Sequence, residues 1–173
     1  AEEEARDPVK ADPAAGATTN PKKEDDRGRG RVVWVGTGEG NGRNSSSWGG
    51  GVYRSTDAGA TFRFVGLAET HDIPRLAIDP RNPDVVYVAA LGHPYGPNEE
   101  RGVFRSKDGS RSFERVLYKD ENTGAAELLL DPADARTLYA VLWEARLAPW
   151  ENGVFDGPGS GLYKSTDGGE TWT

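Results

Sequence analysis

Three aspartates, Asp57, Asp108 and Asp167, stand in a repeated pattern of the kind that could supply acidic groups to a site. In each copy a serine precedes the aspartate by two positions, and the copies align without gaps as GVYRSTDAGATF (51–62), GVFRSKDGSRSF (102–113) and GLYKSTDGGETW (161–172). A carboxylate in such a glycine-containing turn accepts backbone N–H groups, and glycine supplies the positive φ. We therefore predict a structural role for these turns, with the set Ser55, Asp57, Gly59, Ser106, Asp108, Ser165, Asp167 and Gly169.

The middle copy departs from the other two. It has Gly109-Ser110 where another residue followed by glycine is expected, and Ser112 in place of threonine. The sequence thus predicts a looser turn at this copy.

Metal and cofactor sites are not indicated. The aspartate turns lack the alternating Asp/Asn ligands and the final Glu of a calcium loop. His71 and His93 are 22 positions apart, without zinc-motif spacing, and the chain has no cysteine. The run GTGEGNG (36–42) has Asn41 where a dinucleotide fingerprint needs glycine, and it lacks the Gly-Lys-Ser/Thr of a phosphate-binding loop. We expect no metal and no cofactor.

Polar and aromatic residues that could bind a ligand gather in four loops. A carboxylate, an amide, a fixed cation and an indole within ten residues are groups that a sugar or peptide site uses. The candidate ligand-binding residues are Glu39, Asn41, Arg43, Trp48, His71, Arg75, His93, Tyr95, Glu100, Arg101 and Trp150. The alternative is that these side chains only satisfy the backbone of their own loops.

Glycoside hydrolysis would need two facing carboxyl groups, about 5 to 9.5 Å apart. The sequence does not pair the available acids, so the catalytic residues stay undefined; these acids are Glu39, Asp72, Glu100, Glu121 and Glu144.

The repeated turns belong to a longer repeat that defines the fold class. Two further strand patterns recur. The first is found as VVWVG (32–36), VVYVA (85–89) and TLYAV (137–141), and the second as RLAIDP (75–80) and ELLLDP (127–132). Asp57 and Asp108 are 51 positions apart, and Asp79 and Asp131 are 52. A period near 50 with about four short strands per unit is typical of a β-propeller. We predict an all-β partial propeller of four-stranded antiparallel blades, with part of one blade at 32–66, a full blade at 75–118 and another partial blade at 126–173.

Strand direction assigns the loops to two faces. In antiparallel blades the aspartate turns and the short turns after Asp79 and Asp131 share one face. The long loops 37–50, 91–101 and 143–160 then share the other, where we expect any ligand to bind.

Composition limits the remaining function classes. The net charge of −7 disfavours nucleic acid. No apolar run reaches 18 residues and no signal-peptide core is present, so neither a membrane span nor a leader is predicted. Residues 1–31 combine many charges with almost no large apolar side chain, and we expect a disordered linker or insertion there. The absence of methionine indicates a processed protein or a piece of a longer one.

The turn pattern Ser-x-Asp-x-Gly-x-Thr-aromatic resembles the Asp-box (BNR) propellers, which include sialidases, xyloglucan-cleaving propellers and the sortilin (VPS10) ectodomain. The segments TGEGNGRNSSSWGGGVYRSTD, ALGHPYGPNEERGVFRS, LYKDENTGA and GPGSGLYKSTDGGETW look like those of large exported bacterial proteins known as glycosyl hydrolases or sortilin-like proteins. The resemblance covers 32–173. A sialidase is disfavoured, because its converging arginines and Tyr-Glu nucleophile are not identifiable.

The resemblance implies an exported, periplasmic or extracellular, sortilin-like scaffold that binds a peptide or a carbohydrate. The main alternative is a glycoside hydrolase of the BNR-repeat propeller type, and a third is a purely structural segment. Because one whole blade and parts of two others do not close a ring, we expect the remaining blades of a parent chain as partners, and no activity from this piece alone.

Overall fold

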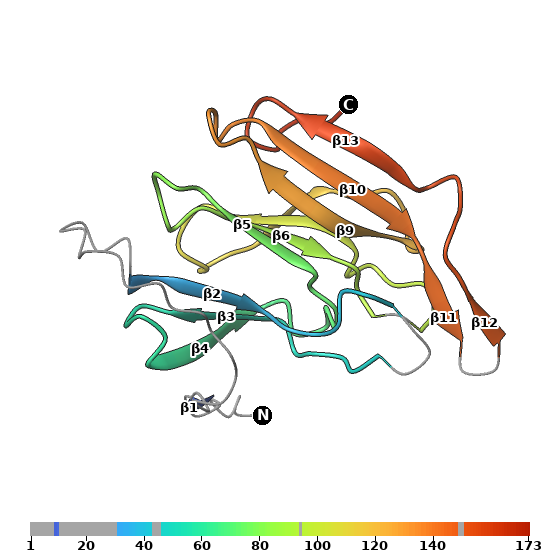
Figure 1. Ribbon diagram of the computed structural model, residues 1–173, viewed down its shortest axis with the longest axis horizontal. Helices are drawn as coiled ribbons and strands as arrows, with labels where there is room; N and C mark the ends of the chain where they lie inside the picture. Colours follow the sequence, from blue (N-terminus) through green and yellow to red (C-terminus); the bar gives the residue numbers. More distant parts are fainter. Residues whose placement is uncertain (1–8, 11–30, 43–45, 94, 149–150) are drawn as a thin grey trace.

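The computed structural model describes residues 9–10, 31–42, 46–93, 95–148 and 151–173. Within these residues the chain forms β-strands and turns and no α-helix, which confirms the all-β prediction (Figure 1). No helix in this part of the chain is long and apolar enough to cross a membrane.

The central sheet, sheet 2, is an antiparallel four-stranded meander. Its strands pair in chain order, and they are β5 (Arg75–Ile78), β6 (Val86–Ala90), β7 (Gly102–Ser106) and β8 (Glu114–Leu117). The β-branched and aromatic residues of β6 suit a strand buried on both faces, and all five of its residues are buried. The predicted four-stranded antiparallel unit is thus confirmed.

Sheets 1 and 3 repeat parts of this unit on either side. Sheet 1 contains β2 (Val33–Gly36), β3 (Val52–Ser55) and β4 (Thr61–Gly66). Sheet 3 contains β9 (Thr123–Leu130), β10 (Leu138–Glu144) and β13 (Gly161–Ser165). The short hairpin of β11 (Arg146–Ala148) and β12 (Glu151–Val154) is inserted in the long loop between β10 and β13.

The head of the chain contributes one short strand. β1 (Val9–Lys10) pairs antiparallel with β4, with Val9 opposite Phe62. Disorder was expected throughout 1–31, so this pairing differs from the expectation at two residues; two β-strand residues find open backbone groups on the outer strand β4. Residues 1–8 and 11–30 lie outside the described residues, and the boundary at residue 31 stays a prediction.

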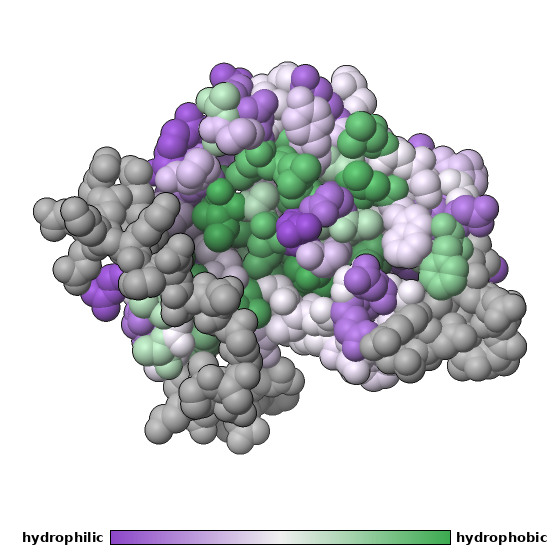
Figure 2. All heavy atoms as spheres, viewed as in Figure 1, coloured by the Kyte–Doolittle hydropathy of each residue, from purple (hydrophilic) through white to green (hydrophobic). Residues whose placement is uncertain are grey.

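Alternate residues of each sheet pack against the neighbouring sheet and form two cores. One core lies between sheets 1 and 2 and contains Trp34, Val52, Val86 and Val88. The other, between sheets 2 and 3, contains Tyr87, Ala89, Val103, Leu128, Leu138, Ala140 and Leu142. In Figure 2 the hydrophobic side chains of the visible face gather around β5, β9 and β10, with polar groups around them. Sheet 2 is therefore covered on both faces.

The two ends of the strands carry different connections. The short turns and the Asp-box turns, by which we mean 55–61, 106–112 and 165–171, lie at the left end in Figure 1, and the long loops with β11 and β12 lie at the right. Each Asp-box turn is tied by one repeated bond to the segment that leads into the neighbouring strand. The backbone N–H groups of Ala58, Gly109 and Gly168 donate to the carbonyls of Arg31, Asp84 and Arg136, which lie two residues before β2, β6 and β10.

Candidate functional site

The Asp-box turns use their carboxylates internally. Asp167 accepts from Ser165 Oγ at 2.7 Å, from Thr171 N at 3.0 Å and from Thr171 Oγ1 at 2.6 Å, while Gly169 N donates to Ser165 Oγ at 2.9 Å. Asp57 makes the same set of bonds. The bonds from Thr171 and Ser165 hold the pKa of Asp167 well below its usual range. These carboxylates are ionised hydrogen-bond acceptors and are poor proton donors.

The middle turn is not looser, which corrects the prediction made from its departures. Ser112 replaces threonine with equivalent bonds, Oγ to Asp108 Oδ2 at 2.7 Å and N to Asp108 Oδ1 at 3.1 Å. Ser110 adopts φ 78°, the left-handed conformation that Gly169 has at φ 89°. A serine hydroxyl makes the threonine bonds, and the turn forces the left-handed conformation even without glycine.

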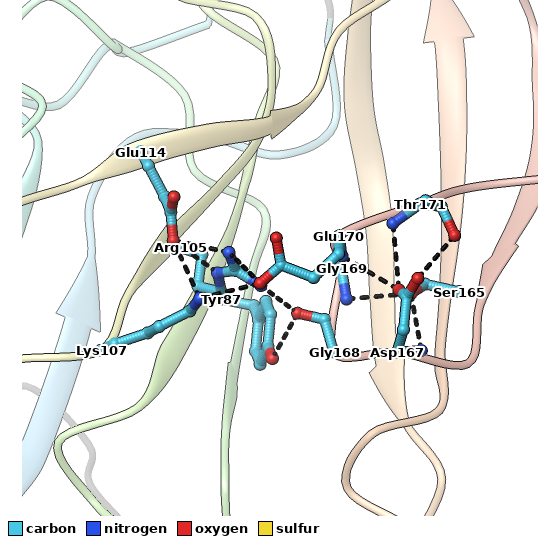
Figure 3. A network of polar contacts seen from close by, with 10 residues as sticks. All are labelled: Tyr87, Arg105, Lys107, Glu114, Ser165, Asp167, Gly168, Gly169, Glu170 and Thr171. Atoms are coloured by element: carbon cyan, nitrogen blue, oxygen red, sulfur yellow. Dashed lines mark hydrogen bonds and ion pairs between the residues drawn. The ribbon is translucent and has the colours of Figure 1, made fainter.

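A buried arginine connects the third Asp-box turn to sheet 2 (Figure 3). The Arg105 side chain, 2% exposed, donates to the carbonyl of Gly168 and pairs with Glu114 at 2.6 Å and Glu170 at 2.9 Å. Tyr87 Oη donates to the same carbonyl at 2.9 Å. Burial lowers the pKa of Arg105, but the bond and charge of Glu114 and the charge of Glu170 outweigh it and raise the pKa. This end of the molecule therefore holds its charged groups in structural pairs.

The long-loop end brings four rings together from three loops. The Trp48 ring lies 5.1 Å from His71 and 6.5 Å from Tyr95, and the His71 ring lies 5.4 Å from His93, between ring centroids. We call Trp48, His71, His93 and Tyr95 the aromatic cluster. Trp48 is 61% exposed, unusually high for an indole, so this cluster presents an aromatic surface to solvent.

Acidic groups surround the aromatic cluster. Glu100 Oε2 lies 3.9 Å from His93 Nε2, and the charges of Glu69 and Glu100 act on His71. Burial and, next, the charge of His93 lower the pKa of His71. A largely neutral imidazole at pH 7 can donate and accept hydrogen bonds, and His71 Nδ1 is buried with no partner among the described residues.

Asn98 holds the His93 loop in shape. It is 7% exposed, and its Nδ2 donates to the carbonyls of His93 at 2.9 Å and Gly96 at 3.1 Å. In the sequence, the signal for this role is an amide in a loop rich in Gly and Pro, where carbonyls need donors.

Asp72 joins the Trp48 loop to the aromatic cluster. Its Oδ1 accepts from Glu39 N at 3.1 Å, and its backbone pairs with Gly92. Gly49 N also donates to the His71 carbonyl at 2.7 Å. Asp72 is 3% exposed, and burial raises its pKa to about 6. The sequence offered Asp72 as one of several acids, but only the structure shows its burial.

Two predicted ligand residues bond to other parts of the protein, Arg101 from a buried position and Arg75 at the surface. Arg101 is 1% exposed and donates to the carbonyls of His93, Gly96, Asn122 and Ala145. Arg75 pairs with Glu127 of sheet 3 at 2.6 Å and 2.8 Å, a bond that raises the pKa of Arg75. Arg101 therefore supports the loops from beneath, and Arg75 links two sheets.

A second aromatic pair lies in the loop after β10. The Trp143 and Phe155 rings stack at 5.7 Å, and Trp143 Nε1 donates to the Phe155 carbonyl at 2.8 Å. Glu144 closes this loop by accepting from Gly159 N at 2.7 Å, so this acid is occupied. Phe155 was not predicted, because an aromatic beside glycine and aspartate gives no periodic signal.

The structure brings together Trp48, His71, His93, Tyr95 and Glu100 of the predicted ligand set, with Glu39 beside Asp72. Asn41 is exposed, with no contact to the aromatic cluster among the described interactions. Arg43 and Trp150 lie outside the described residues. No group of three or more His, Cys, Asp or Glu residues in the described part of the chain could hold a metal ion.

Comparison with known proteins identifies enzymes of similar sequence and fold. No protein-family model matches the sequence. The chain is 26% identical over 157 residues to a xyloglucanase of Hypocrea jecorina (strain QM6a), covering 76% of this chain and 18% of that protein.

The fold is that of solved GH74 enzymes. An ancestral GH74 enzyme matches with a TM-score of 0.54, 23% identity and coverage of 83% of this chain and 18% of that one. The Niastella koreensis GH74 enzyme matches with a TM-score of 0.56 and 20% identity, and the match covers 86% of this chain and 20% of that one. The GH74 xyloglucanase from Xanthomonas campestris matches with a TM-score of 0.56 and 19% identity, over 86% of this chain and 21% of that one. The fold is therefore a partial β-propeller, and the chain spans about a fifth of the length of these proteins.

Proposed function

We propose that this chain forms part of a glycoside hydrolase of the BNR-repeat propeller type, and that its long-loop face binds a neutral polysaccharide. The observation that carries the proposal is the aromatic cluster, assembled from separate loops with Trp48 exposed at its edge. An exposed indole beside imidazoles offers an apolar face to a sugar ring and polar atoms to its hydroxyls. The similarity to xyloglucanases supports the same substrate class.

The charge around the cluster favours a neutral glycan. Glu69 and Glu100 act on His71, and Glu100 lies 3.9 Å from His93. A uronic acid polymer would place carboxylates beside these groups, and like charges in proximity oppose binding. Neutral β-glucans such as xyloglucan have no such cost.

We propose that the chain binds substrate but that the catalytic pair includes a carboxyl group from another part of the parent protein. Two carboxyls must reach the scissile bond. Asp72 is buried and Glu144 bonds within its own loop, so neither is placed to touch a sugar. Glu100, which lies beside His93, is partly exposed.

The test is a titration of the chain with xyloglucan and with polygalacturonate, followed by tryptophan fluorescence and calorimetry. We expect binding of xyloglucan alone, and a loss of affinity of about tenfold in Trp48→Ala, the scale of one aromatic contact. Phe64→Ala, an exposed aromatic on β4, is the matched control and should bind normally. Equal affinity of Trp48→Ala and wild type would exclude the aromatic cluster as the site.

A separate assay, the release of reducing ends, tests the proposal that the catalytic pair is incomplete in this chain. The chain alone should release no reducing ends from xyloglucan. Turnover that disappears in Glu100→Gln would contradict a binding-only role.

A peptide-binding scaffold of the sortilin type is the second hypothesis, and none of the comparisons favours it. The same titration with a mixture of unstructured peptides distinguishes it. A parent protein that cleaves a polymer must meet it outside the cell, so we also propose that the parent is exported.

A further inference from the structure

Trp143 and Phe155, which we call the stacked pair, form a second aromatic surface on the long-loop face. The repeat aligns Trp143 with Leu91, directly after β6, which is 8% exposed and belongs to the interior. Trp143 is only half-buried, and its ring stacks on that of Phe155, which is 41% exposed. The repeated core therefore does not require an aromatic pair at this place.

The stacked pair presents ring surface without a free polar atom. Trp143 Nε1, the one polar atom of the indole, donates to the Phe155 carbonyl at 2.8 Å, a bond that also fixes the orientation of the indole. The Phe155 side chain has no polar atom. Such rings can pack against the C–H face of a sugar, but they cannot bond to its hydroxyl groups. The stacked pair can thus add affinity for a neutral sugar ring without selecting one sugar over another.

The loop that carries Trp48 reaches from the aromatic cluster to the stacked pair. At the base of this loop Glu39 N donates to the carbonyl of Ser47, the residue before Trp48, at 3.2 Å. A Cβ atom on Gly42 would lie 3.8 Å from Phe155 Cε1, so the backbone at Gly42 passes beside the Phe155 ring. The three residues from Glu39 to Gly42 span at most about 11 Å. The two aromatic surfaces are therefore separated by one short segment of loop.

A buried guanidinium holds the two surfaces at a set separation. Arg101 donates to the carbonyl of His93, in the aromatic cluster, at 3.2 Å and to that of Ala145, two residues after Trp143, at 2.9 Å. Ala145 N also donates to the Asn122 carbonyl at 3.1 Å. The donors of a guanidinium form a rigid planar fork, which fixes the two loops relative to each other. A surface held in this way loses little freedom when a ligand binds across it.

We infer that the stacked pair is a second contact for the same glycan chain, so that the long-loop face binds an extended stretch of neutral polysaccharide across both aromatic surfaces. This inference rests on the proposed function, because it extends the site at Trp48. Two contacts to one ligand chain reinforce each other, since binding at the first raises the effective concentration at the second. A glycan long enough to reach Phe155 as well as Trp48 should therefore bind more tightly than a short one.

Calorimetric titration of the chain with xyloglucan oligosaccharides of one, two and three repeat units tests the inference. We expect the affinity of the wild type to rise about tenfold from the shortest to the longest, the scale of one added aromatic contact. The shortest should bind at the aromatic cluster, where imidazoles add hydrogen bonds. Phe155→Ala should therefore bind the shortest normally and lose the rise, whereas Trp48→Ala should bind every length more weakly.

Three further variants serve as controls. Phe155→Tyr keeps the ring and should keep the rise with length. Phe155→Leu keeps an apolar side chain without the ring and should lose the rise, which separates the ring contact from a loosened loop. Phe64→Ala removes a ring of similar exposure, 39%, from sheet 1 and should behave as the wild type. Circular dichroism checks that each variant is folded.

The outcomes separate this inference from the proposed function. Equal affinity of the wild type for all three lengths, or a rise that persists in folded Phe155→Ala and Phe155→Leu, would overturn the second contact and leave the proposed function standing. Failure of the wild type to bind any length would contradict the proposed function itself.

Discussion

Two buried arginines at opposite ends of β7 anchor the two faces of the molecule in different ways. Arg101, just before the strand, is 1% exposed and donates to the neutral backbone carbonyls of His93, Gly96, Asn122 and Ala145. Arg105, near its end, is 2% exposed and pairs with the carboxylates of Glu114 and Glu170. Burial lowers the pKa of Arg101, while the carboxylates raise that of Arg105.

The carboxylates of the two faces also differ in the direction of their pKa shifts. In the Asp-box turns hydrogen bonds from Ser112 lower the pKa of Asp108 to about 2, whereas burial at the long-loop face raises that of Asp72 to about 6. The repeated face pairs its charged groups with one another, whereas the variable face holds buried charged groups without an ion-pair partner. Perturbed groups of this kind collect at functional sites, because a site must present polar atoms to a ligand.

The largest effect is expected from removing Arg101. Arg101→Met leaves buried carbonyls of the His93 and β10–β11 loops without donors, and should lower the free energy of unfolding by on the order of 3 to 5 kcal/mol. Since carbonyls do not titrate, urea unfolding should show most of this loss at both pH 3.5 and pH 7, with a smaller added part at pH 7 from the charges of Asp120 and Asp72. A loss confined to pH 7 would show that Arg101 acts through carboxylates.

Arg105→Met should lower the free energy of unfolding by about 3 kcal/mol at pH 7. This is the lower end of the range for Arg101→Met, because the half-exposed Glu114 and Glu170 regain some hydration when the arginine is removed. The cost should be smaller at pH 3.5, because ion pairing with Glu170 weakens as the pH falls toward the pKa of that group, which its bond to Lys107 and the charge of Arg105 lower. Urea unfolding at the two pH values measures this contrast with Arg101→Met, and equal costs at both would remove the contrast between the faces.

Asp72→Asn tests the raised pKa at the long-loop face. Folded Asp72 keeps its proton up to about pH 6 while the unfolded chain releases it near 3.8, so the native state loses stability as the pH rises between these values. The variant should therefore gain about 2 to 3 kcal/mol relative to wild type between pH 4 and pH 8. If the difference in unfolding free energy between the variant and wild type does not change with pH, the pKa of Asp72 is not raised in the folded protein.

Asp108→Asn is the matched comparison for Asp72→Asn. Its lowered folded pKa stabilises the protein above pH 4 and loses that contribution as the pH falls toward 2. The two asparagine variants should thus show opposite pH slopes in the same unfolding measurement.

Ser165→Ala removes a buried hydroxyl that accepts from Gly169 N and donates to Asp167. The orphaned N–H should lower stability by about 1 to 2 kcal/mol, without changing xyloglucan affinity. Thr166→Ala, the exposed neighbour, is the control. Reduced affinity in a folded Ser165→Ala chain would place function on the Asp-box face.

The smallest effects concern the left-handed residues of the Asp-box turns. Ala58 and Ser110 have φ of 63° and 78°, where a Cβ atom is strained. Ala58→Gly and Ser110→Gly should each stabilise the protein by about 0.5 to 1 kcal/mol, since relief of strain exceeds the added chain entropy. Calorimetric melting measures the gain, and a lower melting temperature would show that the turns are unstrained.

The sequence by itself determined the repeated part of this protein. The strand periods, the aligned Ser-x-Asp turns and the alternation of short and long connections all arise from local patterns, and each copy supports the others. This agreement predicted the propeller class and the grouping of long loops on one side, although not that Ser110 and Ser112 could complete the middle turn.

Only the tertiary structure decided which loop residues meet. Trp48, His71 and His93 come from three loops whose shapes follow no period, and their contact depends on how three sheets stack. The same holds for Arg101 and Asp72, two charged loop residues that the structure buries to 1% and 3% exposure. Burial and charge pairing are properties of contacts between distant segments, so a local pattern does not contain them.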